Sequence, residues 1–129
     1  MKTILIVEND LGLPPILSRK LTQREGIAVK HTDNVEEVMQ IAANGEADLI
    51  LIDVSLLDRV YQGNYVGGIE IIRLLKADPQ TASLPIIVVA PGWVGDKERL
   101  LAQSGADGYL SKPLNYQEVV NQIKALLPD

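Results

Sequence analysis

Residues with chemically useful side chains gather directly behind apolar runs of this sequence. In chain order they are Glu8-Asn9-Asp10, Asp53, Ala90-Pro91 and Lys112-Pro113. Carboxylates suit a hard divalent cation such as Mg²⁺, which keeps several waters and needs only one or two protein carboxylates. A lysine and such a cation together neutralise the charge of an anionic reacting group. The residue types therefore indicate chemistry on an anion, provided that the fold brings them to one place.

Five apolar segments predict the strands that would position these residues. Residues 4–7, 49–52 and 85–90 are continuous apolar runs, which is typical of strands buried on both faces of a parallel sheet. Residues 27–31 and 108–111 are weaker strand candidates. The segments between them carry apolar residues at helical spacing, as at Leu13, Leu17 and Leu21. The order is (βα)5, which predicts an α/β fold with a doubly wound, five-stranded parallel sheet.

Helix boundaries are readable at several points. Asn34 with Glu37, and Asn115 with Glu118, pair a capping residue with an acid three positions later. Pro15 suits the first position of a helix. Asp78-Pro79 is expected to end the third helix.

Composition narrows the classes of function. The 129 residues fit a single domain, residues 1–129, and carry a formal net charge of -5 without any strongly basic stretch. Direct binding of nucleic acid is therefore not expected. No apolar run reaches the roughly 18–20 residues of a membrane span, and the start of the chain is too acidic for a secretion signal. There is no cysteine. We expect a soluble, cytoplasmic protein.

A doubly wound sheet places its functional site at the carboxyl ends of its strands, near the point where the strand order reverses. All four groups above follow directly on a predicted strand. The sequence therefore predicts that Glu8, Asp53 and Lys112 share one edge of the sheet.

The same residues carry a resemblance that runs over the whole chain. The segments ILIVEND, ADLILIDVSL, GGIEIIRLLK, LPIIVVA and GADGYLSKPL resemble, in that order, the receiver domains of response regulators. The resemblance implies a flavodoxin-like sheet in strand order 2-1-3-4-5, with two helices on one face and three on the other. It also implies a cis peptide at Lys112-Pro113.

The resemblance further implies a function in a two-component phosphorelay. Asp53 would accept a phosphoryl group from a sensor histidine kinase or a phosphotransfer protein, and Lys112 would pair with the phosphate. Glu8, Asn9, Asp10 and Asp53 would hold Mg²⁺. Output would pass to a downstream protein through the face formed by helix four, strand five and helix five. Such a domain is not an enzyme beyond its own phosphorylation and dephosphorylation.

Two departures from the family pattern concern the site itself. Asn9 stands where the family usually has its main metal-binding aspartate, so weaker Mg²⁺ binding is expected, with Asp10 as a possible substitute ligand. Ala90 replaces the Ser or Thr whose hydroxyl binds the phosphoryl group, so weakened switching is expected. The aromatic partner of that hydroxyl is present as Tyr109, for which a switching role and a plain core role are equally open.

A third departure is the long segment between Asp53 and Gly68, which is about seven residues longer than usual in the family. Loops of this length tend to be functional or mobile. We expect it to be structureless and to overhang the acidic pocket with Tyr61 and Tyr65, although an inert surface elaboration is equally open.

Other interpretations stay open. Asn9 and Ala90 favour a pseudo-receiver, a protein-interaction module that works without phosphorylation. A phosphatase with an aspartyl nucleophile would need an acid at Ser55, and a flavin-binding protein would need a Ser/Thr/Gly-rich loop after the first strand. His31 is expected to be structural and away from the site, and Trp93 to cover its own loop.

Overall fold

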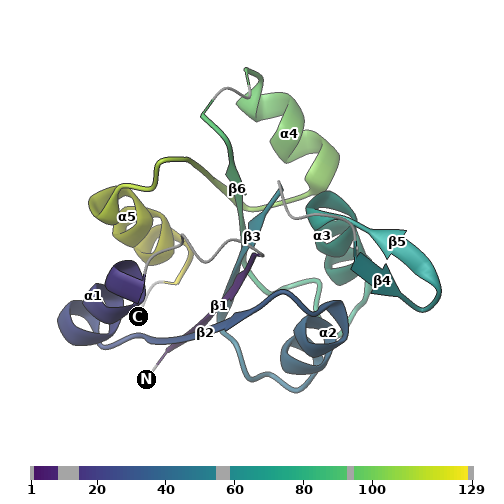
Figure 1. Cartoon of the computed structure of the whole chain (residues 1–129), viewed down its shortest axis with the longest axis horizontal. Helices are drawn as coiled ribbons and strands as arrows, with labels where there is room; N and C mark the ends of the chain where they lie inside the picture. Colours follow the sequence, from purple (N-terminus) through teal and green to yellow (C-terminus); the bar gives the residue numbers. More distant parts are fainter. Residues whose placement is uncertain (1, 9–14, 55–58, 93–94, 128–129) are drawn as a thin grey trace.

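The computed structural model describes residues 2–8, 15–54, 59–92 and 95–127 of the chain. Strands and helices alternate along it, except that the three strands β3, β4 and β5 follow one another (Figure 1). The elements are β1 (Thr3–Val7), α1 (Pro15–Glu25), β2 (Ala28–Thr32), α2 (Val35–Ala43), β3 (Leu49–Asp53), β4 (Arg59–Tyr61), β5 (Asn64–Val66), α3 (Gly68–Ala77), β6 (Ile86–Ala90), α4 (Lys97–Ser104), β7 (Gly108–Ser111) and α5 (Tyr116–Leu126).

Five of the strands form one parallel sheet in the order β2-β1-β3-β6-β7. With the small strands β4 and β5 set aside, this is the predicted order 2-1-3-4-5. The central strands β1, β3 and β6 are almost completely buried, as their continuous apolar runs predict. The prediction of a flavodoxin-like α/β fold is confirmed.

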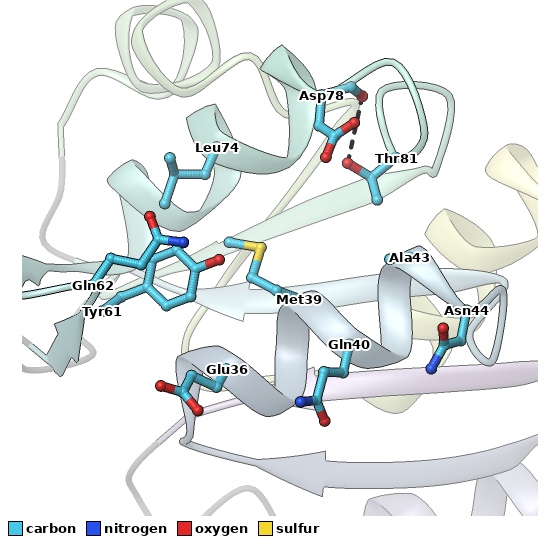
Figure 2. Close-up of a pocket in the computed structure, with 10 residues that line it drawn as sticks. All are labelled: Glu36, Met39, Gln40, Ala43, Asn44, Tyr61, Gln62, Leu74, Asp78 and Thr81. Atoms are coloured by element: carbon cyan, nitrogen blue, oxygen red, sulfur yellow. Dashed lines mark hydrogen bonds between the residues drawn. The ribbon is translucent and has the colours of Figure 1, made fainter.

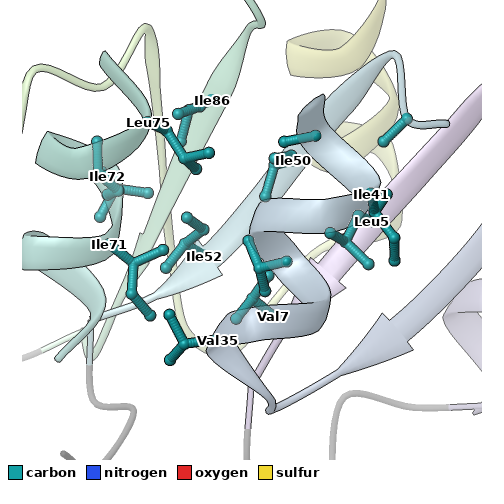
Figure 3. Packing of buried hydrophobic residues seen from close by; sticks show 14 of the residues in the cluster. Leu5, Val7, Val35, Ile41, Ile50, Ile52, Ile71, Ile72, Leu75 and Ile86 are labelled. Carbon is teal, nitrogen blue, oxygen red and sulfur yellow. The ribbon is translucent and has the colours of Figure 1, made fainter. Parts of the chain in front are cut away.

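Helices cover both faces of the sheet, and each face has its own core. On one face, α1 and α5 pack Leu21 and Ile123 against a cluster that includes Ile4 and Val89. On the other face, α2, α3 and α4 enclose a larger cluster of aliphatic side chains (Figure 3). Ile72 and Leu75 of α3 have no exposed surface. The division into two helices and three agrees with the expectation.

Local chemistry sets the helix ends as the sequence predicts. The Asn34 side chain accepts a hydrogen bond from the Glu37 amide at 3.0 Å, and Asn115 accepts one from the Glu118 amide at 3.2 Å. Helix α1 begins at Pro15, and α3 ends at Ala77, before the Asp78-Pro79 pair. The Lys112-Pro113 peptide is cis, as the resemblance implies.

The expectation of a structureless segment after Asp53 is wrong over its second half. Residues 59–66 form an antiparallel hairpin in which Val60 pairs with Tyr65. Its turn, Gln62-Gly63, has positive φ angles of 52° and 81°, the conformation that lets two strands reverse with the correct twist. Tyr61 packs against the core on the α2 and α3 side, whereas Tyr65 is 77% exposed.

None of the helices in the part of the chain that the structure describes is both long and apolar enough to cross a membrane.

Candidate functional site

Two buried carboxylates lie side by side at the carboxyl edge of the sheet. Asp53 is the last residue of β3 and is 2% exposed, and Glu8 directly follows β1 and is 1% exposed. Val7 is in register with Ile52 in the parallel pair β1–β3, so Glu8 is level with Asp53. Neighbouring strands are about 4.8 Å apart. The predicted meeting of these two residues is therefore present.

Lys112 brings a positive charge to this pair. Its ammonium group forms an ion pair with the Asp53 carboxylate. The lysine follows β7, and its backbone amide donates a hydrogen bond of 2.8 Å to the carbonyl of Ala90 at the end of β6. A buried carboxylate is costly without a partner charge, and Lys112 supplies that partner for Asp53. The sheet thus joins residues that are far apart in the sequence.

The start of α3 packs tightly against the backbone of the same strand end. A β-carbon on Gly68 would lie 2.5 Å from the Asp53 carbonyl oxygen and 3.0 Å from the Cα of Val54. Only glycine allows this approach without a shift of the backbone. The end of β3 and the first turn of α3 are therefore in close backbone contact.

His31 lies at the site, which corrects the expectation that it would be away from it. Its Nε2 atom is 3.2 Å from Oε1 of Glu8. The reason is the register of the sheet, because β2 pairs with β1 and their carboxyl ends leave the sheet together: the Glu8 amide donates to the Thr32 carbonyl at 3.1 Å. The imidazole is partly exposed, so it contacts the acid from the solvent side.

Ala90 and Tyr109 lie on the neighbouring strands β6 and β7, two residues apart in register, since Ala90 pairs with Ser111 and Tyr109 pairs with Val88. Ala90 is fully buried at the end of β6, and Tyr109 is partly buried on β7, where it packs against the cluster on the α4 side. The Lys97 ammonium of α4 is 5.6 Å from the centre of the Tyr109 ring, within the range of a cation–π contact. Ala90 has no hydroxyl to offer toward Asp53.

The donor set at this edge suits Mg²⁺. Glu8 and Asp53 are carboxylates and so could offer the hard oxygen ligands that Mg²⁺ prefers, since this cation is usually bound by one or two carboxylates with water filling the remaining positions. The described residues contain no cluster of three acidic, histidine or cysteine side chains, so a ligand cage made by the protein alone is not present among them. The predicted ligands Asn9 and Asp10, together with Ser55 and Trp93, lie outside the described residues.

Sequence reasoning missed two features around the site. The contact between His31 and Glu8 depends on strand pairing, and no local pattern signals it. The hairpin does have a local signal, because the β-prone pairs Val60-Tyr61 and Tyr65-Val66 lie on either side of the turn at Gln62-Gly63.

Comparisons with known proteins agree with this arrangement. Residues 4–124 match the family described as the response regulator receiver domain. The chain is 34% identical over 130 residues to the polar-differentiation response regulator DivK of Brucella anthropi, covering 99% of this chain and 98% of that protein. It is 33% identical to DivK of Brucella ovis, with the same coverage.

Solved structures share the fold. A response regulator from Desulfuromonas acetoxidans superposes with a TM-score of 0.78 at 24% identity, covering 98% of this chain and 96% of that one. The receiver domain of a sensor histidine kinase from Pseudomonas aeruginosa, which holds a magnesium ion in its active site cleft, gives a TM-score of 0.75 at 21% identity and covers 97% and 96%.

Proposed function

The chain belongs to the response regulator receiver family, and from this membership we propose that it accepts a phosphoryl group on the carboxylate of Asp53. The observation that carries the proposal is the buried Asp53 carboxylate, which is ion-paired to Lys112 and level with Glu8 at the carboxyl edge of the sheet. We propose residues 1–129 as a single receiver domain of a two-component phosphorelay that works in the cytoplasm. Its donor is a sensor histidine kinase or a phosphotransfer protein.

Asp53 is the nucleophile of the proposed transfer. One of its carboxylate oxygens forms a bond to phosphorus while the bond between phosphorus and the donor's imidazole nitrogen breaks. The electron pair of that bond stays on the imidazole, which takes a proton from solvent. The product is an acyl phosphate on Asp53, and attack by water at phosphorus later releases inorganic phosphate and restores the carboxylate. The protein contributes position and charge.

Lys112 and Glu8 supply that charge and position. The Lys112 ammonium is already beside the acceptor, so it offsets negative charge on the transferring oxygens without a large rearrangement. We propose that Glu8 and Asp53 hold Mg²⁺, with Asn9 and Asp10 as further ligands, and that binding is weakened because Asn9 is uncharged. When bound, the cation offsets further charge on the phosphoryl oxygens.

We propose a positioning role for His31. The imidazole nitrogen lies 3.2 Å from one oxygen of the buried Glu8 carboxylate, so we infer that this contact fixes the orientation of the carboxylate. Groups that orient a metal ligand in this way commonly change metal affinity without touching the metal.

Transmission of the phosphorylated state is proposed to be weak. The proposed output surface is the face of α4, β7 and α5, the face expected to contact a downstream protein. Ala90 lacks the hydroxyl that would donate a hydrogen bond to a phosphoryl oxygen, and such a bond to a charged group contributes about 1.5–3 kcal/mol. Phosphorylation is therefore expected to change the conformation of Tyr109, whose ring contacts Lys97, only weakly.

The alternative function is that of a pseudo-receiver, which binds partners through the same fold without being phosphorylated. Ala90 and Asn9 favour it. Incubation with acetyl phosphate and Mg²⁺, followed by intact mass measurement, separates the two. We expect slow addition of one phosphoryl group in the parent protein and none in Asp53→Ala. Absence of the adduct in the parent would favour the pseudo-receiver, and an adduct that persists in Asp53→Ala would place the acceptor elsewhere.

A second experiment tests transmission. With beryllofluoride and Mg²⁺ as the phosphoryl mimic, we expect chemical-shift changes near Asp53 and small changes at Tyr109 and α5. The Ala90→Thr variant should extend the changes to Tyr109. Large shifts across α5 in the parent protein would contradict weak transmission.

A further inference from the structure

A second concave surface lies away from the acceptor, between α2, the β4–β5 hairpin and α3. We name it the α2–α3 groove, and its volume is about 460 Å³, within the roughly 300–1,000 Å³ of known ligand pockets. Figure 2 shows Met39 of α2 near its centre, with Tyr61 and Gln62 of the hairpin beside it and Leu74 of α3 above. The hairpin contacts α2 through β4, and its residues Tyr61 and Gln62 form one end of the groove.

The floor of the groove is apolar. Met39 and Tyr61 are partly buried and pack against the core cluster, so their positions are supported from below. Leu74 is 39% exposed although it lies on the helix that carries the fully buried Ile71 and Leu75. These three side chains form a continuous apolar surface that water reaches.

The rim of the groove is acidic. Glu36 and Asp78 are the charged residues among the described residues that line it. The two basic residues of α3 turn to the opposite side of the helix. Arg73 donates to the Gln103 carbonyl at 2.8 Å, and Lys76 forms an ion pair with Asp107 at 2.7 Å. Helix α3 thus directs its positive charge toward α4 and β7 and leaves the groove side negative.

The groove is open rather than enclosed. Among the lining residues that the structure describes, Thr81 is buried, Met39 and Tyr61 are partly buried, and the others are exposed. A small molecule in such a place keeps much of its surface in water, whereas bound small ligands usually bury about 70–90% of theirs. A side chain of a protein partner can be buried more completely in such a groove, because the rest of the partner covers the open side.

From this floor, rim and openness we propose that the α2–α3 groove docks a protein partner through a segment in which bulky aliphatic residues adjoin Lys or Arg. The aliphatic side chain would cover Met39, Tyr61 and Leu74, and the cationic group would reach Glu36 or Asp78. Such an interaction goes beyond the phosphorelay function and does not depend on phosphorylation of Asp53. It gives the chain a contact surface separate from the face of α4, β7 and α5.

The test uses a synthetic peptide as the probe, with sequence GKLLKRLG, on the unphosphorylated full chain. Chemical-shift mapping should show saturable changes centred on Met39, Gln40, Gln62 and Leu74. Two matched peptides separate the contributions: one has Ser in place of each Leu, and the other has Glu in place of each Lys and Arg. Each should bind at least about tenfold more weakly, which corresponds to ~1.4 kcal/mol.

Variants locate the site. Glu36→Lys and Leu74→Lys should each weaken binding of the parent peptide by about tenfold or more. Glu98→Lys on α4 and Ile16→Lys on α1 are matched controls, since both residues are exposed on other elements, and they should bind as the parent does. Circular dichroism and urea denaturation verify that each variant is folded.

Several outcomes would overturn the proposal. These are shifts centred outside the groove, equal binding of the Glu-substituted peptide, or equal weakening by the control variants. Isopentylammonium ion, titrated without any peptide, tests whether a small amphipathic cation binds in the groove. If it saturates the groove as tightly as the peptide does, the occupant is a small amphipathic cation and a protein partner is not needed. Because none of these measurements involves Asp53 chemistry, failure here leaves the phosphorelay proposal untouched.

Discussion

The carboxyl edge of the sheet around Asp53, the proposed acceptor, is named here the acceptor edge, and helix α3 joins it to the α2–α3 groove. The two regions differ in the burial and the pairing of their acidic side chains. Helix α3 begins at Gly68, directly against the backbone of Asp53, and further along presents Leu74 to the groove. At the acceptor edge the carboxylates are buried and Asp53 is paired with Lys112. In the groove the acids are exposed, and no Lys or Arg is among the described lining residues.

This contrast indicates how each region responds to change. At the acceptor edge, burial makes charge and packing interdependent, so a single substitution should affect both stability and chemistry. In the groove, solvent screens the charges and the apolar groups are only partly covered, so a substitution should alter binding and leave the fold intact. The predictions below test that difference.

The largest effect is expected for Lys112→Met. Removing one partner of a buried ion pair costs about 3–5 kcal/mol in general, and we expect about 1–3 kcal/mol here because the lysine side chain is 29% exposed. Urea denaturation measures the loss. In the Asp53→Asn background the same substitution should cost markedly less, since the carboxylate is gone. An equal cost in both backgrounds would mean that the ion pair is not the source of the effect.

Gly68→Ala should destabilise the protein by about 1–3 kcal/mol through overpacking against Asp53 and Val54. Helix propensity alone predicts the opposite result, because alanine is a better helix former than glycine. Gly95→Ala is the matched control, since a β-carbon there meets nothing within 4 Å. Equal denaturation midpoints for the two variants would refute the close packing of α3 on the acceptor strand.

His31→Ala should weaken Mg²⁺ binding about threefold to tenfold. This is at or below the lower end of the roughly 10- to 100-fold effects of groups that orient metal ligands, because the imidazole is partly exposed. Calorimetric titration with Mg²⁺ at constant pH measures it. His31→Gln, whose amide can still donate to Glu8, should retain most of the affinity. Lys30→Ala, on the preceding exposed residue, serves as the control. Loss of affinity in Lys30→Ala alone would show that His31 has no specific role.

Glu36→Gln should change the free energy of unfolding by less than about 0.5 kcal/mol, since the residue is exposed and removal of its charge leaves the fold's packing unchanged. The same variant should bind the basic peptide more weakly. Denaturation and peptide titration on one preparation give both values. A large loss of stability would mean that the groove belongs structurally to the core, contrary to the comparison above.

The smallest effect concerns Glu46, behind α2. Hydrogen bonds from Asn44 and Lys30, together with the Lys30 charge, hold the pKa of Glu46 below its usual value. Lys30→Gln should raise that pKa toward the usual value, as followed by carboxyl NMR.

The sign of the effect on stability follows from linkage. A depressed pKa in the folded state stabilises the protein above the unfolded-state pKa, and this contribution is lost as the pH falls through the folded-state pKa. The stability difference between parent and Lys30→Gln should therefore shrink in acid. A difference that grows as the pH falls would exclude Glu46 as its source.

The sequence alone determines most of the secondary-structure elements and the edge of the sheet at which the site residues lie. Buried parallel strands read as continuous apolar runs, and the caps at Asn34 and Asn115 are local patterns, so the succession of strands and helices along the chain and several helix starts follow from residues near one another. The order of the strands within the sheet came from the family resemblance, because it depends on the pairing of distant segments. Asp53 and Lys112 could also be placed together, because parallel strands bring their carboxyl ends to one edge. Gly68 at the start of α3 is likewise visible in the sequence.

Only the tertiary structure decides which side chains meet across elements. His31 contacts Glu8 because β2 pairs with β1 in a particular register, and Arg73 and Lys76 turn from the groove because their partners Gln103 and Asp107 lie on the far side of α3. The hairpin had a turn signal in Gln62-Gly63, but its packing against α2 had none. Spacing along the chain specifies which face of an element a side chain occupies, whereas the partner on that face depends on how separate elements pack, and that geometry is not a local property of the sequence.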